Sequence, residues 1–188
     1  MRSWLHYSTE VPNIAMGGQA YVSGFEESVP FLAKLMSEQR YDGVLGFSQG
    51  GIVFRHFYRL TQVVEPGQWS FHMPRFLITV GTPVYPETKV KYRDMLLEHP
   101  DPEQFIDIPS LHMKGLKDPY LEKLSMERFF IKPAVVVEYD DGHKFPRKME
   151  DSEFKKLHDF IKEQYTAVLE CECPDLPFPT FDFPSTRN

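Results

Sequence analysis

The segment Gly46-Phe47-Ser48-Gln49-Gly50 has the residue types and spacing of a nucleophile turn. It follows an apolar, strand-like run and precedes a helical pattern, which predicts a sharp strand-to-helix turn with Ser48 at its apex. Such a turn strains the apex backbone, and glycines two residues before and two residues after it avoid collisions. The backbone N–H of Gln49 would then lie at a helix N-terminus, facing any negative charge that develops there. We therefore predict Ser48 as a nucleophile and the Gln49 N–H as an oxyanion-hole donor; a glycine-rich turn with an incidental serine is the alternative.

A serine hydroxyl needs a base to react at neutral pH. In sheets with this kind of turn, the partners follow the serine in the chain order Asp or Glu, then His, each just beyond a strand. Asp118 stands just past the third strand-like run, and His143 stands in a turn just past the fourth. Three residues of the right type, order and position are hard to attribute to chance, so we predict a catalytic triad of Ser48, His143 and Asp118.

Each partner also has a simpler interpretation. Asp118 precedes Pro119 and would cap a following helix whatever its other role, and His143 could be an ordinary loop histidine. Asp140 and Asp141 are competing acids, but they adjoin the histidine in sequence and are expected to point elsewhere. We expect structural or surface roles for the remaining histidines, which are His6, His56, His72, His99, His112 and His158.

Strand-like and helical patterns alternate along the chain. The strand-like runs are Asp42–Phe47, Arg75–Val80, Ile106–Met113 and Ala134–Tyr139. The helical patterns are Phe25–Gln39, Gly50–Val63, Pro119–Phe130 and Phe154–Leu169, the last with Ser152 as its cap. This alternation predicts an α/β fold with a mostly parallel sheet and helices on both faces. The stripe expected to face the core from the last helix is Phe154, Leu157, Ile161, Tyr165 and Val168.

Two regions fit this alternation less well. Residues 82–105 contain prolines around a charged stretch, Glu87–Glu98, which predicts an insertion with a helix over the edge of the sheet. The segment from Glu170 is rich in Pro and Phe and is expected to be extended or disordered. The predicted organisation is one domain over residues 1–169 and a tail over residues 170–188.

Composition excludes several classes of protein. The chain has 188 residues, which suits one domain with a sizeable core. A net charge of −6 and the lack of any Lys/Arg run argue against nucleic-acid binding. No stretch of the sequence is long and apolar enough to span a bilayer, and the first residues do not have the pattern of a signal peptide. Cys171 and Cys173 predict neither a disulfide framework nor a metal site, and a reducing intracellular compartment is expected.

Several motifs resemble the eukaryotic FSH-type serine hydrolases. The run Tyr41–Gly50 contains DGVLGFSQG, the hallmark of that family, and is preceded by the matching run Phe25–Ser28. The segment Leu111–Asp118 is similar to the family's acid loop, and Asp141–Pro146 is similar to its histidine loop. The resemblance runs from about residue 1 to about residue 168. It implies an α/β-hydrolase fold, esterase or thioesterase-like activity on acyl esters, a cytoplasmic or nuclear location, and neither a metal nor an organic cofactor.

One feature of the family is missing from the sequence. Members open with a hydrophobic strand and a His-Gly loop whose backbone N–H completes the oxyanion hole, and residues 1–22 contain neither. The N-terminal strands are therefore expected to be absent, whether the chain is a fragment, a shortened isoform or a variant. An unpaired edge on the Asp42–Phe47 strand would then favour self-association.

Two functions from different classes follow from these observations. The first is hydrolysis of carboxylic esters or thioesters through an acyl-enzyme on Ser48. The alternative is a catalytically impaired hydrolase-fold protein with a binding or regulatory role, which the missing N-terminal portion favours. Phosphoryl transfer or nucleotide binding is a distant third, because the sequence has neither a P-loop nor a GxGxxG motif.

Overall fold

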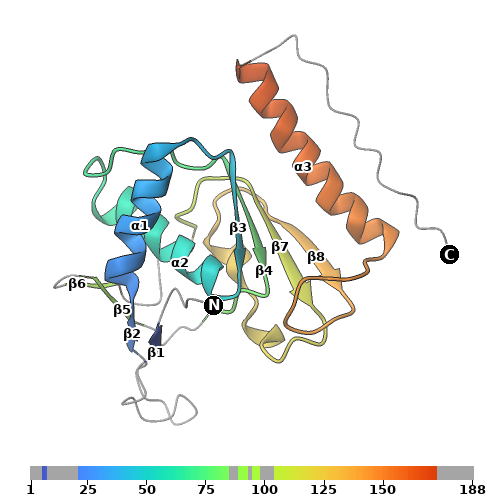
Figure 1. Ribbon diagram of the computed structural model, residues 1–188. Helices are drawn as coiled ribbons and strands as arrows, with labels where there is room; N and C mark the ends of the chain where they lie inside the picture. The colour runs from blue at the N-terminus through green and yellow to red at the C-terminus, as the bar shows by residue number, and fades with distance from the viewer. Residues whose placement is uncertain (1–5, 8–20, 85–88, 93–94, 98–103, 173–188) are drawn as a thin grey trace.

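The computed structural model of the chain describes residues 6–7, 21–84, 89–92, 95–97 and 104–172 (Figure 1). Its centre is a parallel four-stranded sheet with the strand order β3-β4-β7-β8. The strands are β3 (Gly43–Phe47), β4 (Phe76–Val80), β7 (Ser110–Gly115) and β8 (Val135–Tyr139). All four predicted strands are present, and the parallel sheet with its helices confirms the predicted α/β fold class.

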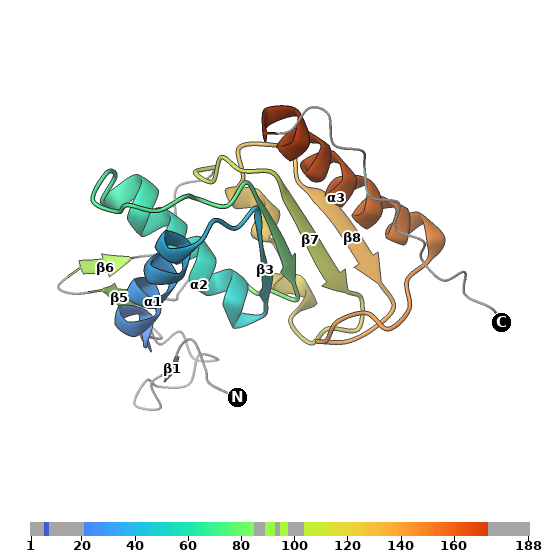
Figure 2. The ribbon, with the colours of Figure 1, turned by 45° about the horizontal axis from the view of Figure 1, so that its top comes forward.

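Helices lie on both sides of this sheet. Helix α1 (Phe25–Glu38) and helix α2 (Gln49–Tyr58) lie on one side, and α2 continues as a π-helical segment, η2 (Arg59–Val64). Helix α3 (Asp151–Glu172) lies on the other side, next to β8 (Figures 1 and 2). Neighbouring parallel strands must be joined by a crossover connection, which passes over one face of the sheet. Between β3 and β4 this connection contains α2, so a helical layer covers that face.

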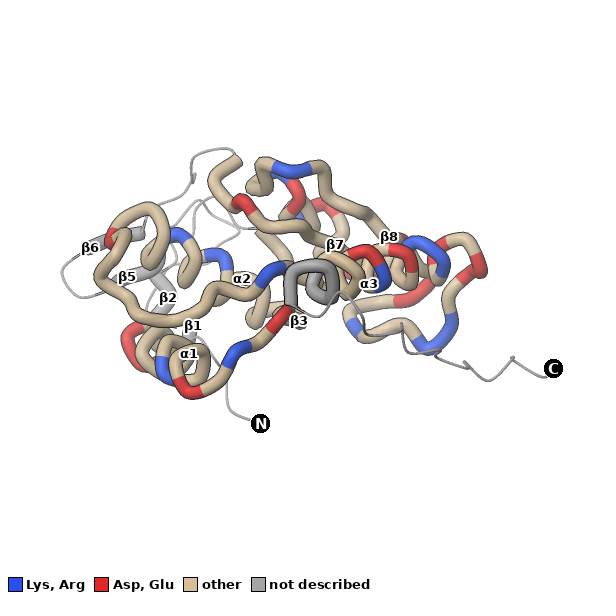
Figure 3. The backbone as a smooth tube through the Cα atoms, turned by 90° about the horizontal axis from the view of Figure 1, so that it is seen from above, with Lys and Arg blue, Asp and Glu red and all other residues tan. Residues whose placement is uncertain are grey.

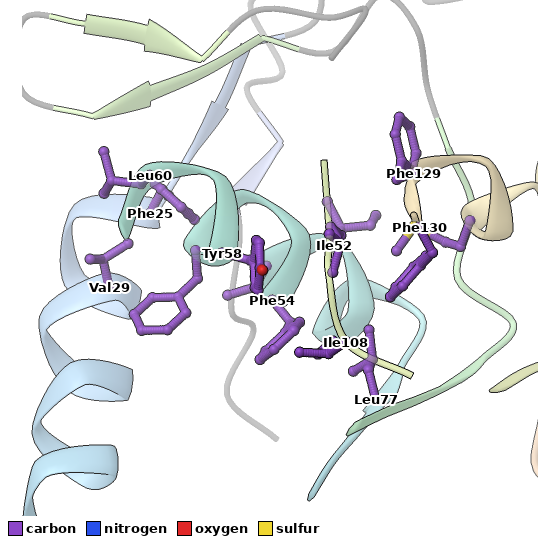
Figure 4. Close-up of a cluster of buried hydrophobic side chains, with 14 of the residues drawn as sticks. Phe25, Val29, Ile52, Phe54, Tyr58, Leu60, Leu77, Ile108, Phe129 and Phe130 are labelled. Atoms are coloured by element: carbon purple, nitrogen blue, oxygen red, sulfur yellow. The ribbon is translucent and has the colours of Figure 1, made fainter. Parts of the chain in front are cut away.

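Two buried apolar clusters hold the helices against the sheet. The larger joins Phe25 of α1 and Phe54 of α2 to Leu77 of β4 (Figure 4). The smaller contains Ile78 of β4 and Phe160 of α3. Leu77 and Ile78 are neighbours in sequence but belong to different clusters, because successive side chains of a strand point to opposite faces. The sheet is therefore packed on both faces, with one apolar cluster on each.

A second, smaller sheet contradicts the expected helix over Glu87–Glu98. It has the order β1-β2-β5-β6, with β1 (His6–Tyr7), β2 (Tyr21–Ser23), β5 (Lys89–Tyr92) and β6 (Met95–Leu97). Strands β5 and β6 pair antiparallel, and β5 pairs parallel with β2. In the sequence Lys-Val-Lys-Tyr, charged lysines alternate with valine and tyrosine. This period of two suits a strand better than a helix. Strand β1 and the first residues of β2 lie within residues 1–22, but they belong to this smaller sheet and not to the parallel sheet, whose N-terminal strands were expected to be absent.

The expected helix over Pro119–Phe130 is also wrong. The segment instead forms two short 3₁₀ helices, η3 (Leu121–Lys123) and η4 (Met126–Phe129). Its backbone hydrogen bonds span three residues, as in Lys123 N to Tyr120 O, and the run is broken at Ser125, whose N–H bonds the carbonyl of Lys123. The apolar spacing that indicated a helix comes from separate turns: η3 buries no side chain, whereas Leu124 after it and Met126 and Phe129 of η4 are buried.

Helix α3 differs from its prediction in where it begins and in its buried face. It begins at Asp151, so Ser152 lies inside the helix and is not its cap. Phe160 and Gln164 are buried, whereas Phe154 and Ile161 of the predicted stripe are exposed. The helix packs on β8 through a face rotated from the predicted one. It also extends to Glu172, two residues beyond the predicted start of the tail, and residues 173–188 lie outside the described part of the chain.

Acidic and basic residues are interspersed along the described backbone (Figure 3). On α3, for example, Lys155 pairs with Asp159 and Lys156 pairs with Glu153. None of the helices in the described ranges combines the length and the apolar character needed to cross a membrane.

Strand β3 is an edge strand of the parallel sheet. In the described part of the chain it pairs only with β4, and its Leu45 side chain is 55% exposed. An exposed edge presents unpaired backbone N–H and C=O groups to other chains. Self-association through this edge therefore stays a prediction of the sequence, and the structure supplies the residue with which to test it.

Leu45→Lys is expected to reduce self-association, because a charged side chain on an edge strand opposes pairing with another chain. Sedimentation velocity over a range of concentrations should show dimers or larger species for the wild type and a shift towards monomer for the variant. Ile131→Lys, at an equally exposed position after η4, is the matched control and should sediment like the wild type. A monomeric wild type at every concentration would contradict the prediction.

A buried polar network crosses the sheet between β4 and β7. His112 Nδ1 is hydrogen-bonded to Thr79 Oγ1 at 2.7 Å, and its Nε2 to Ser110 Oγ at 3.0 Å. All three side chains are buried. Burial, with a smaller contribution from the charge of Lys114, lowers the pKa of His112 to about 3. His112 is thus a neutral structural histidine, the role expected from the sequence.

This pKa predicts how stability changes with pH. An unfolded histidine has a pKa of about 6.5, so between about pH 6.5 and pH 3 the unfolded chain binds a proton that folded His112 does not. The stability due to neutral His112 is complete above pH 6.5 and is lost as the pH falls, by about 2 kcal/mol at pH 5.

Urea unfolding at a series of pH values measures this effect. His112→Gln keeps hydrogen-bonding capacity without a titrating ring, so its free energy of unfolding should fall less steeply than that of the wild type between pH 6.5 and 4. His158→Gln changes a histidine outside the core, on α3, and should keep the wild-type slope. Parallel slopes for the wild type and His112→Gln would show that His112 does not have the lowered pKa.

Candidate active site

Ser48 occupies a strained turn between β3 and α2. Its φ of 50° and ψ of −114° lie outside the conformations that a residue with a side chain normally adopts. Its N–H donates to the Val80 carbonyl at 2.9 Å, and its own carbonyl accepts from the N–H of Gly51 at 3.2 Å. These bonds tie the turn to the end of β4 and to the first turn of α2. Helix α2 begins at Gln49, so the backbone places that residue at a helix N-terminus, as predicted.

The glycines needed by this turn are Gly46 and Gly51. A Cβ atom on Gly46 would lie 2.7 Å from the Gly51 nitrogen, and a Cβ on Gly51 would lie 2.3 Å from Thr82 Oγ1. A Cβ on Gly50 would meet nothing within 4 Å. The predicted need for glycine is therefore confirmed at Gly46 and wrong at Gly50, because the close neighbour of the helix start is Thr82 in the loop after β4.

The structure brings the three predicted triad residues into one hydrogen-bonded chain. His143 Nε2 lies 2.9 Å from Ser48 Oγ, and His143 Nδ1 lies 2.8 Å from Asp118 Oδ2. The Asp118 side chain is fully buried, while the His143 side chain is 24% exposed. The geometry permits the imidazole to accept the hydroxyl proton on one side and to be oriented by the carboxylate on the other.

These residues meet because four parallel strands end at the same edge of the sheet. Ser48 follows β3, Asp118 follows β7 and His143 follows β8, and the register of neighbouring strands aligns their carboxyl ends. Figure 2 shows β7 and β8 ending on the side of the sheet where α2 begins. Open parallel sheets bind ligands at this edge.

The two oxygens of Asp118 have different partners. While Oδ2 contacts the imidazole, Oδ1 accepts a hydrogen bond from the N–H of Tyr120 at 2.8 Å. No α-helix directly follows Asp118, so it is not the helix cap of the simpler interpretation, but its Oδ1 does hold the backbone at Tyr120. The backbone bond fixes the carboxylate and thereby the direction of its second oxygen.

The competing acids point away from the imidazole. Asp140 pairs with Lys117 at 2.7 Å, and Asp141 pairs with Lys144 at 2.7 Å. Hydrogen bonds from the Lys144 side chain and the Gly142 N–H lower the pKa of Asp141. Both carboxylates thus act within the loops and not on His143, as expected from the sequence.

Gly81 was not singled out from the sequence, yet it lies against the site. It directly follows β4 and has a φ of +55°, which favours glycine. A Cβ there would lie 3.1 Å from His143 Nδ1 and 3.2 Å from Asp118 Oδ2. A side chain at this position would press on the hydrogen bond between the imidazole and the carboxylate. The sequence feature that could have identified Gly81 is its position, because it stands just past a predicted strand, as Ser48 does.

Three exposed aromatic residues around His143 were also not singled out. The ring of Phe47 lies 5.2 Å from the imidazole, and that of Tyr120 lies 5.3 Å from it, edge-on. Phe145 stacks on Phe47 at 5.3 Å. The accessible side of the imidazole is therefore bordered by apolar rings. Within the described ranges, no cluster of three or more His, Cys, Asp or Glu side chains could hold a metal ion.

This geometry agrees with the comparisons with known proteins. The profile of the family described as serine hydrolase (FSH1) matches residues 1–155. The chain belongs to the serine hydrolase (FSH1) family. Membership confirms the resemblance seen in the nucleophile, acid and histidine loops.

Several relatives carry the name esterase. Esterase OVCA2 of Homo sapiens is 28% identical over 136 residues, covering 70% of this chain and 55% of the relative. Esterase C25G4.2 of Caenorhabditis elegans is 26% identical over 176 residues, covering 90% of this chain and 73% of the relative. The chain thus spans little more than half the length of the human esterase that it matches.

A solved structure supports the fold. The RedJ thioesterase from the prodiginine biosynthetic pathway of Streptomyces coelicolor superposes with a TM-score of 0.50 at 14% identity, covering 80% of this chain and 71% of that chain. At this identity the likeness concerns the fold alone, and it confirms the predicted α/β-hydrolase architecture.

Proposed function

We propose that this FSH1-family chain hydrolyses carboxylic esters or thioesters through an acyl-enzyme on Ser48. The observation that carries the proposal is the continuous hydrogen-bonded chain from Ser48 Oγ through His143 to the buried Asp118. The strained apex conformation of Ser48 supports it further, since that conformation lifts the hydroxyl to the edge where the strands end.

In the proposed reaction, Ser48 Oγ attacks the acyl carbonyl carbon while His143 Nε2 takes the hydroxyl proton. The tetrahedral oxyanion faces the Gln49 N–H at the start of α2, and the imidazolium then protonates the leaving alcohol or thiol as its bond to the acyl carbon breaks. Water repeats the sequence on the acyl-enzyme and releases the carboxylic acid. Asp118 holds the imidazole in the tautomer that both steps require and stabilises its charged form.

The apolar rings beside the imidazole support an acyl substrate over a strongly charged one. Phe47 and Phe145 present stacked, partly exposed faces next to His143. Such surfaces favour the hydrocarbon part of an ester or thioester.

Labelling with a fluorophosphonate probe, together with hydrolysis of a short-chain p-nitrophenyl ester and its thioester analogue, tests the proposal. Covalent labelling and turnover of at least one substrate are expected. Labelling without turnover of either substrate would favour the alternative, a catalytically impaired protein of this family. A chain that neither labels nor turns over substrate would overturn the proposed function.

A further inference from the structure

The hydroxyl of Tyr139 closes the loop that carries His143. Tyr139 is the last residue of β8, and its side chain is 3% exposed. Its ring lies in the buried cluster that joins the sheet to α3. The hydroxyl donates a 2.7 Å hydrogen bond to the carbonyl of Lys144, the residue that follows His143. One end of the loop is thus tied to its other end through a side chain anchored in the core.

The rest of the loop is short and held by its backbone. The Asp141 N–H donates to the Tyr139 carbonyl at 2.8 Å, and the Lys144 N–H donates to the Gly142 carbonyl at 2.8 Å. These bonds shape the loop locally, but each joins residues only two apart. In the described part of the chain, the Tyr139 hydroxyl is the side-chain link from the core to the residue after His143.

The histidine loop also packs against the loop that carries Asp118. The Lys117 N–H donates to the Asp141 carbonyl at 2.9 Å. A Cβ on Gly115 would lie 2.5 Å from the Gly142 oxygen, so the two loops touch without intervening side chains. A shift of the histidine loop would therefore change the distance between the imidazole and the carboxylate.

The hydroxyl remains a donor throughout the working range of pH. Burial, followed by the charges of Asp118 and Asp141, raises the pKa of Tyr139 to about 12.

We propose that Tyr139 is a positioning residue, whose hydroxyl holds the His143 loop in the register that joins Ser48 and Asp118. The inference rests on the proposed function. The hydroxyl contacts neither the substrate nor the reacting atoms; it acts through the Lys144 carbonyl. Small displacements of a catalytic group have large kinetic costs, about 100-fold for 1 Å.

Tyr139→Phe removes this hydroxyl and leaves the ring in the core. We expect kcat for a p-nitrophenyl ester to fall about tenfold with KM changed less than twofold, because substrate contacts remain while the imidazole loses its fixed position. The rate of fluorophosphonate labelling should fall by a similar factor. The proton between His143 Nδ1 and Asp118 should give a downfield NMR signal that is sharp in the wild type and broadened in the variant.

Tyr58→Phe is the matched control. Tyr58 is also buried, and its hydroxyl accepts a hydrogen bond from the Asp107 N–H at 3.2 Å, far along α2 from Ser48. This variant should lose stability like any protein that loses a buried hydrogen bond, but its kcat and its NMR signal should match the wild type. If Tyr139→Phe yields little folded protein, Tyr139→Met also lacks the hydroxyl and keeps a long apolar side chain in the cluster, and the same measurements apply to the folded fraction from gel filtration.

The outcomes separate this inference from the proposed function. Wild-type kcat, labelling rate and NMR signal in Tyr139→Phe would overturn the positioning role and leave the ester hydrolysis intact. Equal losses of kcat in Tyr139→Phe and Tyr58→Phe would also overturn it, since the effect would then be one of general stability. A wild type that neither labels nor turns over substrate would overturn the proposed function itself, and the positioning role with it.

Discussion

Replacing Ser48 by alanine is expected to abolish both ester turnover and covalent labelling while leaving the fold intact. The hydroxyl is the proposed attacking group, and removing the serine of such a triad lowers kcat by about 10⁶. Initial rates on a p-nitrophenyl ester and gel-based detection of fluorophosphonate labelling measure the two effects. Circular dichroism should show an unchanged helix content, because alanine fits the same turn.

Ser152→Ala provides the control for Ser48→Ala. Ser152 is an exposed residue near the start of α3, so its removal should change neither labelling nor turnover. Persistent labelling of another serine in the Ser48→Ala protein would show that the nucleophile lies elsewhere.

Replacing Asp118 by asparagine is expected to lower kcat/KM by about 10⁴, the second largest effect. Asparagine has the same shape, and its amide oxygen can still accept the Tyr120 N–H bond that shapes the loop. The group facing His143 Nδ1 would then be an NH₂ donor, which favours the wrong imidazole tautomer and does not stabilise the imidazolium. Steady-state kinetics over a range of pH, together with thermal unfolding, separate this loss from a loss of stability.

Asp140→Asn is the matched change, because Asp140 lies near His143 in sequence but pairs with the exposed Lys117. Its kcat/KM should stay within about threefold of the wild type, as expected for a surface ion pair. A severe loss in Asp140→Asn, or a loss below tenfold in Asp118→Asn, would assign the orienting acid to a different residue.

The sequence alone determined the parts of the site that depend on local signals. A strand that contains a glycine near its end, followed by a serine and then a helix, specifies a turn with a strained backbone. Ser48 has this strain, with a φ of 50°. The order and strand-end positions of Asp118 and His143 were sufficient to predict their meeting, because strands of a parallel sheet all end at one edge. The strand pattern likewise predicted the sheet.

The tertiary structure decided everything that depends on contacts between distant segments. Gly51, not Gly50, is needed beside the nucleophile, because Thr82 from another loop occupies the space of its side chain. Gly81 matters because His143 and Asp118 approach it from other strands. The charged stretch before residue 98 forms β5 and β6 because β2 offers a strand with which β5 pairs, and the local alternation of side chains does not identify that partner.

The same reason explains the faces of the helices and the closure of the histidine loop. An amphipathic pattern shows that α3 must bury a stripe, but its contact with β8 chose Phe160 over Ile161. Tyr139 is an ordinary strand residue in the sequence, and only the folded loop places its hydroxyl on the Lys144 carbonyl. Local sequence sets which turns and strands can form, and packing between them sets which side chains complete the site.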